Sequence, residues 1–127
     1  MALALTAGLS TAQVNDTCVE TMYASNNSGN VGGAVYFDVN ASELVSISGL
    51  RTNLGDGVGT PVSLDVYTTS GTSFGAELNG AAWALVASSN SVAAGEDNPT
   101  QFLFNTPFWL QPTTTGVALV LTGGHHQ

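Results

Sequence analysis

Short runs in which apolar and polar residues alternate are the feature that most restricts how this chain can fold. The clearest run is residues 61–68, PVSLDVYT, in which the apolar residues Val62, Leu64 and Val66 are separated by single, more polar residues. A period of two is typical of a β-strand with one buried face. Residues 76–86 are the best helical candidate, and Gly80 within them argues against more than one helical turn. The pattern therefore predicts an all-β fold.

Eight short strands are expected from residue 14 onward: residues 14–23, 34–40, 44–50, 61–68, 83–88, 101–105, 108–110 and 116–122. Turn signals separate them at intervals of about ten residues, which predicts an antiparallel two-sheet sandwich of either jelly-roll or immunoglobulin-like order. Residues 116–122 are apolar on both faces, as is typical of a central strand. A length of 127 residues suits one domain. We assign residues 13–127 to this sandwich domain.

The remaining residues, 1–12, form an apolar amino-terminal segment, MALALTAGLSTA. Its last three residues have the small-x-small pattern that ends a secretion signal, and the run is too short to span a bilayer. Leu3, Leu5 and Leu9 all lie at odd positions, which is the periodicity of a strand. Two interpretations stay open: a signal-peptide remnant, or an ordered strand that joins its own sheet or is donated to a neighbour.

Charge is sparse and one-sided in this chain. Charged residues make up 8%, the net charge is −8, and Arg51 is the single cation because lysine is absent. Such a surface repels phosphate, which argues against nucleic-acid binding and against anionic membranes. A polar surface made of Ser, Thr and Asn predicts an extracellular or cell-surface location. Cys18 has no partner in the chain, so it is expected either to be buried or to form an intermolecular disulfide.

Six stretches resemble a β-sandwich module of secreted bacterial surface proteins, multidomain proteins of which some carry a PEP-CTERM-type sorting tail. They are residues 23–38, 45–50, 60–68, 81–86, 94–99 and 116–121. The resemblance covers about residues 21–126 and implies a sandwich with no assigned reaction. Such modules continue past a Gly-His pair, like Gly124-His125, into one or two further strands. The resemblance therefore implies an unfilled sheet edge, and residues 1–12 of a neighbouring copy are the expected strand to fill it.

The sequence offers little for catalysis or metal binding. His125 and His126 are the only histidines and stand at the carboxyl end, so we expect a solvated tail or tag remnant and no enzyme activity. No cofactor is predicted. Calcium is the one candidate metal, because the loops 55–57 (GDG) and 95–98 (GEDN) could supply oxygen ligands. Neither loop has a full calcium-binding pattern, so ordinary turn chemistry is the favoured interpretation.

The sequence supports sugar binding better than catalysis or metal binding, because sugar sites use exposed aromatic residues beside Asn, Asp and Gln. The candidates are Tyr36, Tyr67, Trp83 and Trp109, and the alternation of their strands places both tyrosines on the outward face. The competing interpretation is that the two tryptophans pack in the core with the phenylalanines.

The leading functional prediction is a non-catalytic extracellular structural subunit. It would assemble with copies of itself into a filament or surface layer by donating residues 1–12. The alternative is a carbohydrate-binding or adhesion module of a secreted protein, with glycans as partners. Sequons at Asn15, Asn26 and Asn40 are candidate glycosylation sites in either case.

Overall fold

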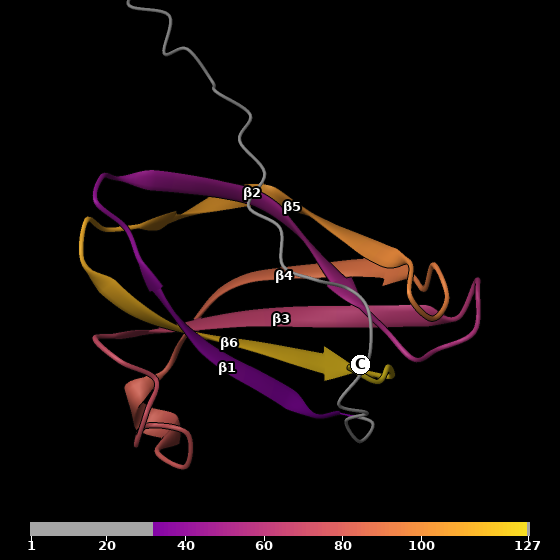
Figure 1. Ribbon diagram of the computed structural model, residues 1–127, viewed down its shortest axis with the longest axis horizontal. Helices are drawn as coiled ribbons and strands as arrows, with labels where there is room; N and C mark the ends of the chain where they lie inside the picture. The colour runs from indigo at the N-terminus through magenta and orange to yellow at the C-terminus, as the bar shows by residue number, and fades with distance from the viewer. Residues whose placement is uncertain (1–31, 127) are drawn as a thin grey trace, which may run out of the picture.

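The structure, a computed structural model, describes residues 32–126 and is an antiparallel β-sandwich (Figure 1). Its strands are β1 (Ala34–Asn40), β2 (Val45–Asn53), β3 (Pro61–Ser70), β4 (Ala84–Val92), β5 (Pro99–Leu110) and β6 (Thr114–Thr122). One sheet has the order β1-β6-β3-β4, and the other pairs β2 with β5. The helical turn η1 (Gly80–Ala82) is short, and no helix in residues 32–126 is long and apolar enough to cross a membrane. The predicted all-β two-sheet sandwich is confirmed.

Three of the eight expected strands need comment. Residues 14–23 lie outside the described part of the chain, and the two strands expected at 101–105 and 108–110 are one strand, β5. Pro107 suggested a break because proline cannot donate to a ladder. In β2, Ile47 pairs with Phe108 and Gly49 with Leu103, so residues 104–107 have no register partner. Pro107 falls within this bulge, where the strand continues without its hydrogen bond.

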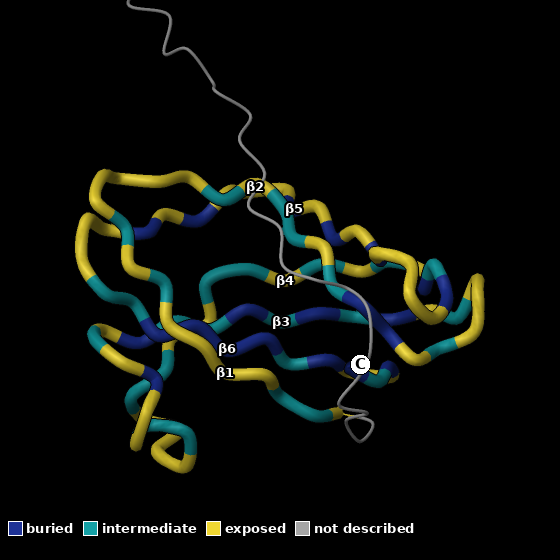
Figure 2. Tube along the Cα trace, in the orientation of Figure 1, coloured by how far each residue is buried: buried dark blue, intermediate teal, exposed yellow. Residues whose placement is uncertain are grey.

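The core lies between the two sheets and is centred on β3 and β6. β6 is a central strand, as its two apolar faces predicted, and residues 61–67 of β3 alternate between buried and less buried residues (Figure 2). The two strands pack their buried leucines together, since Leu64 is opposite Leu121 in the ladder. The buried apolar residues of the core are Leu54, Val62, Leu64, Val66, Ala93, Phe102, Phe104, Phe108, Leu110, Val117, Leu119 and Leu121.

Serine side chains of β4 form hydrogen bonds to the backbone of β5 where the two strands run side by side. The hydroxyl of Ser89 donates to the carbonyl oxygen of Leu103 at 2.7 Å, and the hydroxyl of Ser91 donates to that of Gln101 at 2.6 Å. β4 and β5 belong to different sheets and form no ladder. The hydroxyls therefore satisfy backbone carbonyls that a neighbouring strand would otherwise bond.

Candidate functional site

The first candidate site is the side of the sandwich formed by β1 and β2, which we call the open side. Within residues 32–126, no strand pairs with the outer edge of β1, and β2 has a strand partner on one edge. Val35 and Phe37 lie on the inward face of β1, because their ladder partners Leu119 and Val117 are core residues. They nevertheless stay 41% and 37% exposed, and Figure 2 shows most of β1 as exposed. Apolar side chains that point inward are thus incompletely covered here.

Strand β2 forms the opposite margin of the open side. Val45, Ile47 and Leu50 each pair with a buried residue of β5, which places them on the inward face. Val45 is 39% exposed, whereas Ile47 and Leu50, like Val39 of β1, are partly buried against the core. The open side is therefore an apolar surface between two strand edges, and an inserted strand would cover it.

Directly after β2, the chain begins an antiparallel pairing with its carboxyl-terminal residues. Leu54 and His126 form an isolated antiparallel bridge, and the N–H of Gly55 donates to the carbonyl of His125 at 3.1 Å. A strand continuing in the direction of His126 would run back along β2, since paired chains in such a bridge are oppositely oriented. Because β5 occupies one edge of β2, that strand would take the other edge.

Several predicted site residues lie outside residues 32–126. They are the assembly-strand residues Leu3, Leu5 and Leu9, the single cysteine Cys18, and the sequons at Asn15 and Asn26. The third sequon asparagine, Asn40, is the last residue of β1 and is exposed. Its side chain is therefore accessible, and its glycosylation stays a prediction.

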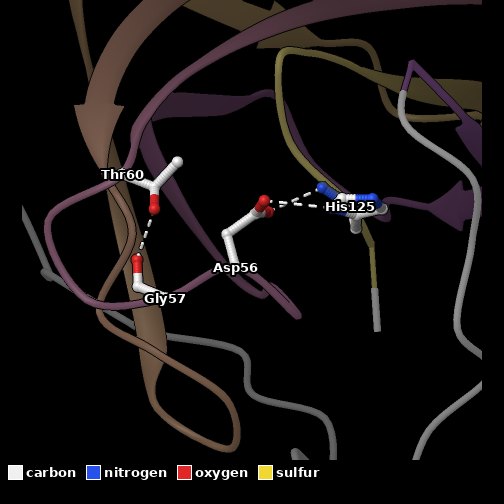
Figure 3. Close-up of polar contacts among 4 residues, drawn as sticks. All are labelled: Asp56, Gly57, Thr60 and His125. Atoms are coloured by element: carbon white, nitrogen blue, oxygen red, sulfur yellow. Dashed lines mark hydrogen bonds and ion pairs between the residues drawn. The ribbon is translucent and has the colours of Figure 1, made fainter.

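The histidines at the carboxyl end are held within the fold, so the expectation of a solvated tail was wrong. The N–H of His125 donates to Oδ2 of Asp56 at 2.7 Å, and its Nδ1 lies 3.0 Å from Oδ1 (Figure 3). Nε2 of His126 lies 3.1 Å from the carbonyl oxygen of Leu119, and His126 is 5% exposed. Asp56 stands 69 positions before His125, so this contact depends on tertiary structure.

The polar groups of the two loops considered for calcium make contacts within the protein, one of them over a long sequence separation. Both carboxylate oxygens of Asp56 contact His125, and the hydroxyl of Thr60 donates to the carbonyl of Gly57 at 2.7 Å to close the turn (Figure 3). In the loop 95–98, the N–H of Asn98 donates to the carbonyl of Gly95 at 3.1 Å. The described part of the chain holds no group of three or more His, Cys, Asp or Glu residues that could bind a metal ion.

Burial and hydrogen bonding shift the pKa values of His126 and Asp56. The pKa of His126 lies below its ordinary value because burial disfavours the charged ring, which outweighs the opposing effect of the Leu119 carbonyl. Burial by itself raises the pKa of Asp56. Hydrogen bonds from the backbone and ring of His125, together with the charge of that ring, outweigh burial and hold the pKa of Asp56 below 3.8.

We expect the sandwich to lose stability as the pH falls below 6.5, the ordinary pKa of histidine. Folded His126 binds a proton more weakly than the unfolded chain does, so acid favours unfolding, by at most about 1.4 kcal/mol per pH unit for one group. The contribution of Asp56 is present above pH 3.8 and is lost only below it. Urea unfolding between pH 8 and pH 5 measures the loss. His126→Gln should show a flatter profile, and an unchanged slope in that variant would contradict the assignment.

The second candidate site is an aromatic cluster on the outer face of the four-stranded sheet. Tyr36 of β1 and Tyr67 of β3 are both paired with Ala118 of β6, so they flank it on the same face. The ring centroid of Trp83 lies 5.5 Å from that of Tyr36, with 54° between the ring planes. Trp109 does not join them, because it lies on β5 in the other sheet and is 58% exposed. Three of the four predicted sugar-binding aromatics thus come together.

Hydrogen bonds hold the segment between β3 and β4 in place at the margin of this aromatic cluster. Asp38 of β1 accepts two hydrogen bonds, from the N–H of Ser73 at 2.7 Å and from the hydroxyl of Thr72 at 2.6 Å. These bonds, that of the Ser73 N–H first, hold the pKa of Asp38 below its ordinary value. At the end of the segment, Nε1 of Trp83 donates to the carbonyl of Ala76 at 2.9 Å. The indole ring is therefore fixed against its own loop.

A polar groove between β3, β4 and β5 lies next to the aromatic cluster, because Asp65, which lines it, is two residues from Tyr67 on the same face of β3. Oδ1 of Asp65 accepts a hydrogen bond from the hydroxyl of Ser88, and Oδ1 of Asn90 accepts one from Ser63 at 2.7 Å. The groove is lined by Ser63, Asp65, Ser88, Ser89, Asn90, Leu103 and Asn105. Sequence reasoning missed this groove, although the alternation that placed Tyr67 outward does the same for Asp65.

Residues 32–126 therefore present two surfaces suited to binding: the open side, and the outer face that carries the aromatic cluster and its groove. Both surfaces are defined by contacts within the chain and not by similarity to another protein. The resemblance to a surface-protein module stays a prediction. No protein-family model, no curated protein and no solved structure matches the chain.

Proposed function

We propose that this protein is a non-catalytic extracellular structural subunit that assembles with copies of itself into a filament or surface layer. The observation that carries the proposal is the open side, where inward-facing Val35, Phe37 and Val45 stay about 40% exposed between two strand edges. An added strand would satisfy backbone N–H and C=O groups along one edge and cover these side chains.

In this proposal, residues 1–12 of a neighbouring copy supply the added strand. The spacings between Leu3, Leu5 and Leu9 are two and four residues. Both are even numbers, so one face of an extended segment would carry all three side chains. Covering the remaining exposed area of each core-edge side chain contributes on the order of 1 kcal/mol. Pairing along the seven residues of β1 would fix the register. Donation between copies joins one subunit to the next.

Substitution within the donated segment tests the proposal. We expect the full chain to form regular fibres or sheets in electron microscopy and to sediment as large species. Leu5→Asp should remain monomeric, because a charge on the inserted face cannot be buried without a partner. Leu78→Asp is the matched control, since Leu78 is fully exposed in the β3–β4 segment and lies off the open side. This control should assemble like the wild type.

A synthetic peptide of residues 1–12 separates the donor from the acceptor. The Leu5→Asp subunit keeps an intact open side and should bind the peptide. A subunit that carries both Leu5→Asp and Phe37→Asp should not bind it. A monodisperse monomer formed by the wild-type chain, or normal assembly of Leu5→Asp, would overturn the proposal.

A further inference from the structure

We infer that the outer face of the four-stranded sheet binds a neutral oligosaccharide, with the aromatic cluster stacking on sugar rings and the adjacent groove bonding their hydroxyls. The aromatic cluster lies on the face of this sheet opposite the core, and the groove extends from β3 and β4 to Leu103 and Asn105 of β5. This site is separate from the open side, and it would give an assembled subunit a ligand on its surface.

The aromatic cluster supplies the apolar part of the site. Tyr36 is 40% exposed, and Tyr67 and Trp83 are partly exposed. Tyr36 and Tyr67 are each one strand from Ala118, so their backbones are about 10 Å apart, two strand spacings. Ala118 is only 3% exposed on this face, which means that neighbouring side chains close over it. Aromatic rings that present apolar area beside a polar tip suit the C–H faces of a pyranose.

The groove supplies the polar part of the site. Five of its seven lining residues carry neutral hydroxyl or amide groups: Ser63, Ser88, Ser89, Asn90 and Asn105. Such groups both donate and accept hydrogen bonds, which matches the hydroxyls of a sugar. Asp65 adds one carboxylate. Its Oδ1 accepts a hydrogen bond from the hydroxyl of Ser88, and this bond orients the carboxylate. Ligand sites generally combine apolar contact area with a few oriented polar groups in this way.

Charge selects a neutral ligand over an anionic one. The single cation of the chain, Arg51, lies on β2 in the other sheet. A sulfate, phosphate or uronate on the outer face would meet Asp65 and Asp38 with no lysine or arginine to pair with. The net charge of −8 repels anions further.

Titration calorimetry of the full chain tests the site with maltohexaose, cellohexaose and chitohexaose as neutral probes, and with a polygalacturonate hexasaccharide as the anionic probe. We expect at least one neutral probe to bind and the anionic probe to fail. Tyr67→Ala and Asp65→Ala should each weaken binding about tenfold, which corresponds to 1.4 kcal/mol. Trp109→Ala is the matched control, because Trp109 is an exposed aromatic on the other sheet. Its affinity should equal that of the wild type.

Fluorescence distinguishes local contact from a structural effect. The chain has two tryptophans, so Trp109→Phe leaves Trp83 as the single reporter. The emission of Trp83 should shift as the neutral probe saturates the site. Leu5→Asp should bind the probe as the wild type does, so failure of assembly does not affect this test. The inference is overturned if no neutral probe binds, if Trp109→Ala loses affinity as Tyr67→Ala does, or if a lysine-rich peptide binds in place of the sugars.

Discussion

Phe102→Ala is expected to lower the free energy of unfolding by about 3–5 kcal/mol. The Phe102 side chain is fully buried and lies opposite Leu50 in the β2–β5 ladder. Truncation removes its apolar contacts and leaves a cavity between the sheets, which the rigid ladder cannot fill. The loss is large against the total stability of a domain, about 5–15 kcal/mol. Urea unfolding followed by circular dichroism measures it.

Leu103→Ala is the control for this experiment. Leu103 follows Phe102 on the same strand but points outward and is 64% exposed. Its truncation should change the free energy of unfolding by no more than about 0.5 kcal/mol. A comparable loss in the two variants would show that the sheets do not meet at Phe102 as described.

Gly116→Ala is the second change for which we expect a large effect, about 1–3 kcal/mol of lost stability. A Cβ on Gly116 would lie 2.6 Å from Cγ2 of Thr69, 2.8 Å from the backbone N of Ser73 and 3.0 Å from its Cα. Backbone atoms must move to admit the methyl group. The bond from the Ser73 N–H to Asp38 would then weaken, and Trp83 at the end of the same segment would be displaced.

Thermal unfolding and Trp83 emission in the Trp109→Phe background report the two consequences of Gly116→Ala. Gly80→Ala serves as the control, because a Cβ there meets no atom within 4 Å and Gly80 lies in the same β3–β4 segment. Gly80→Ala should leave both the midpoint of unfolding and the emission close to wild type. Equal behaviour of the two variants would mean that Gly116 is not a close-contact position.

Local periodicity predicted the strands well where alternation is clean. The bounds expected for β1 agree with the structure, since residues 34–40 alternate without a turn residue. β5 was divided in error because Pro107 looks like a strand breaker in isolation. Only the register against β2 reveals the bulge that accommodates it. Such a bulge depends on two strands at once, so a single segment of sequence cannot show it.

The candidate sites depended more strongly on tertiary structure. Alternation predicted that Tyr36 and Tyr67 point outward, but their position on either side of Ala118 follows from the pairing of three strands. The pairing of Asp56 with His125 had no local signal at all. Adjacent histidines near a chain end gave no indication that one would be buried, because burial of His126 follows from the bridge to Leu54.

The serine hydroxyls of β4 have a consequence for how an assembly would grow. Ser89 and Ser91 bond the carbonyls of β5, so the β4–β5 flank offers fewer unpaired backbone groups than the opposite flank. Subunits that add through only one flank stack head to tail, and such a heterologous contact extends in one dimension unless its rotation closes a ring. The resulting fibre would be polar, with chemically different ends, and new subunits would add to it in a single orientation.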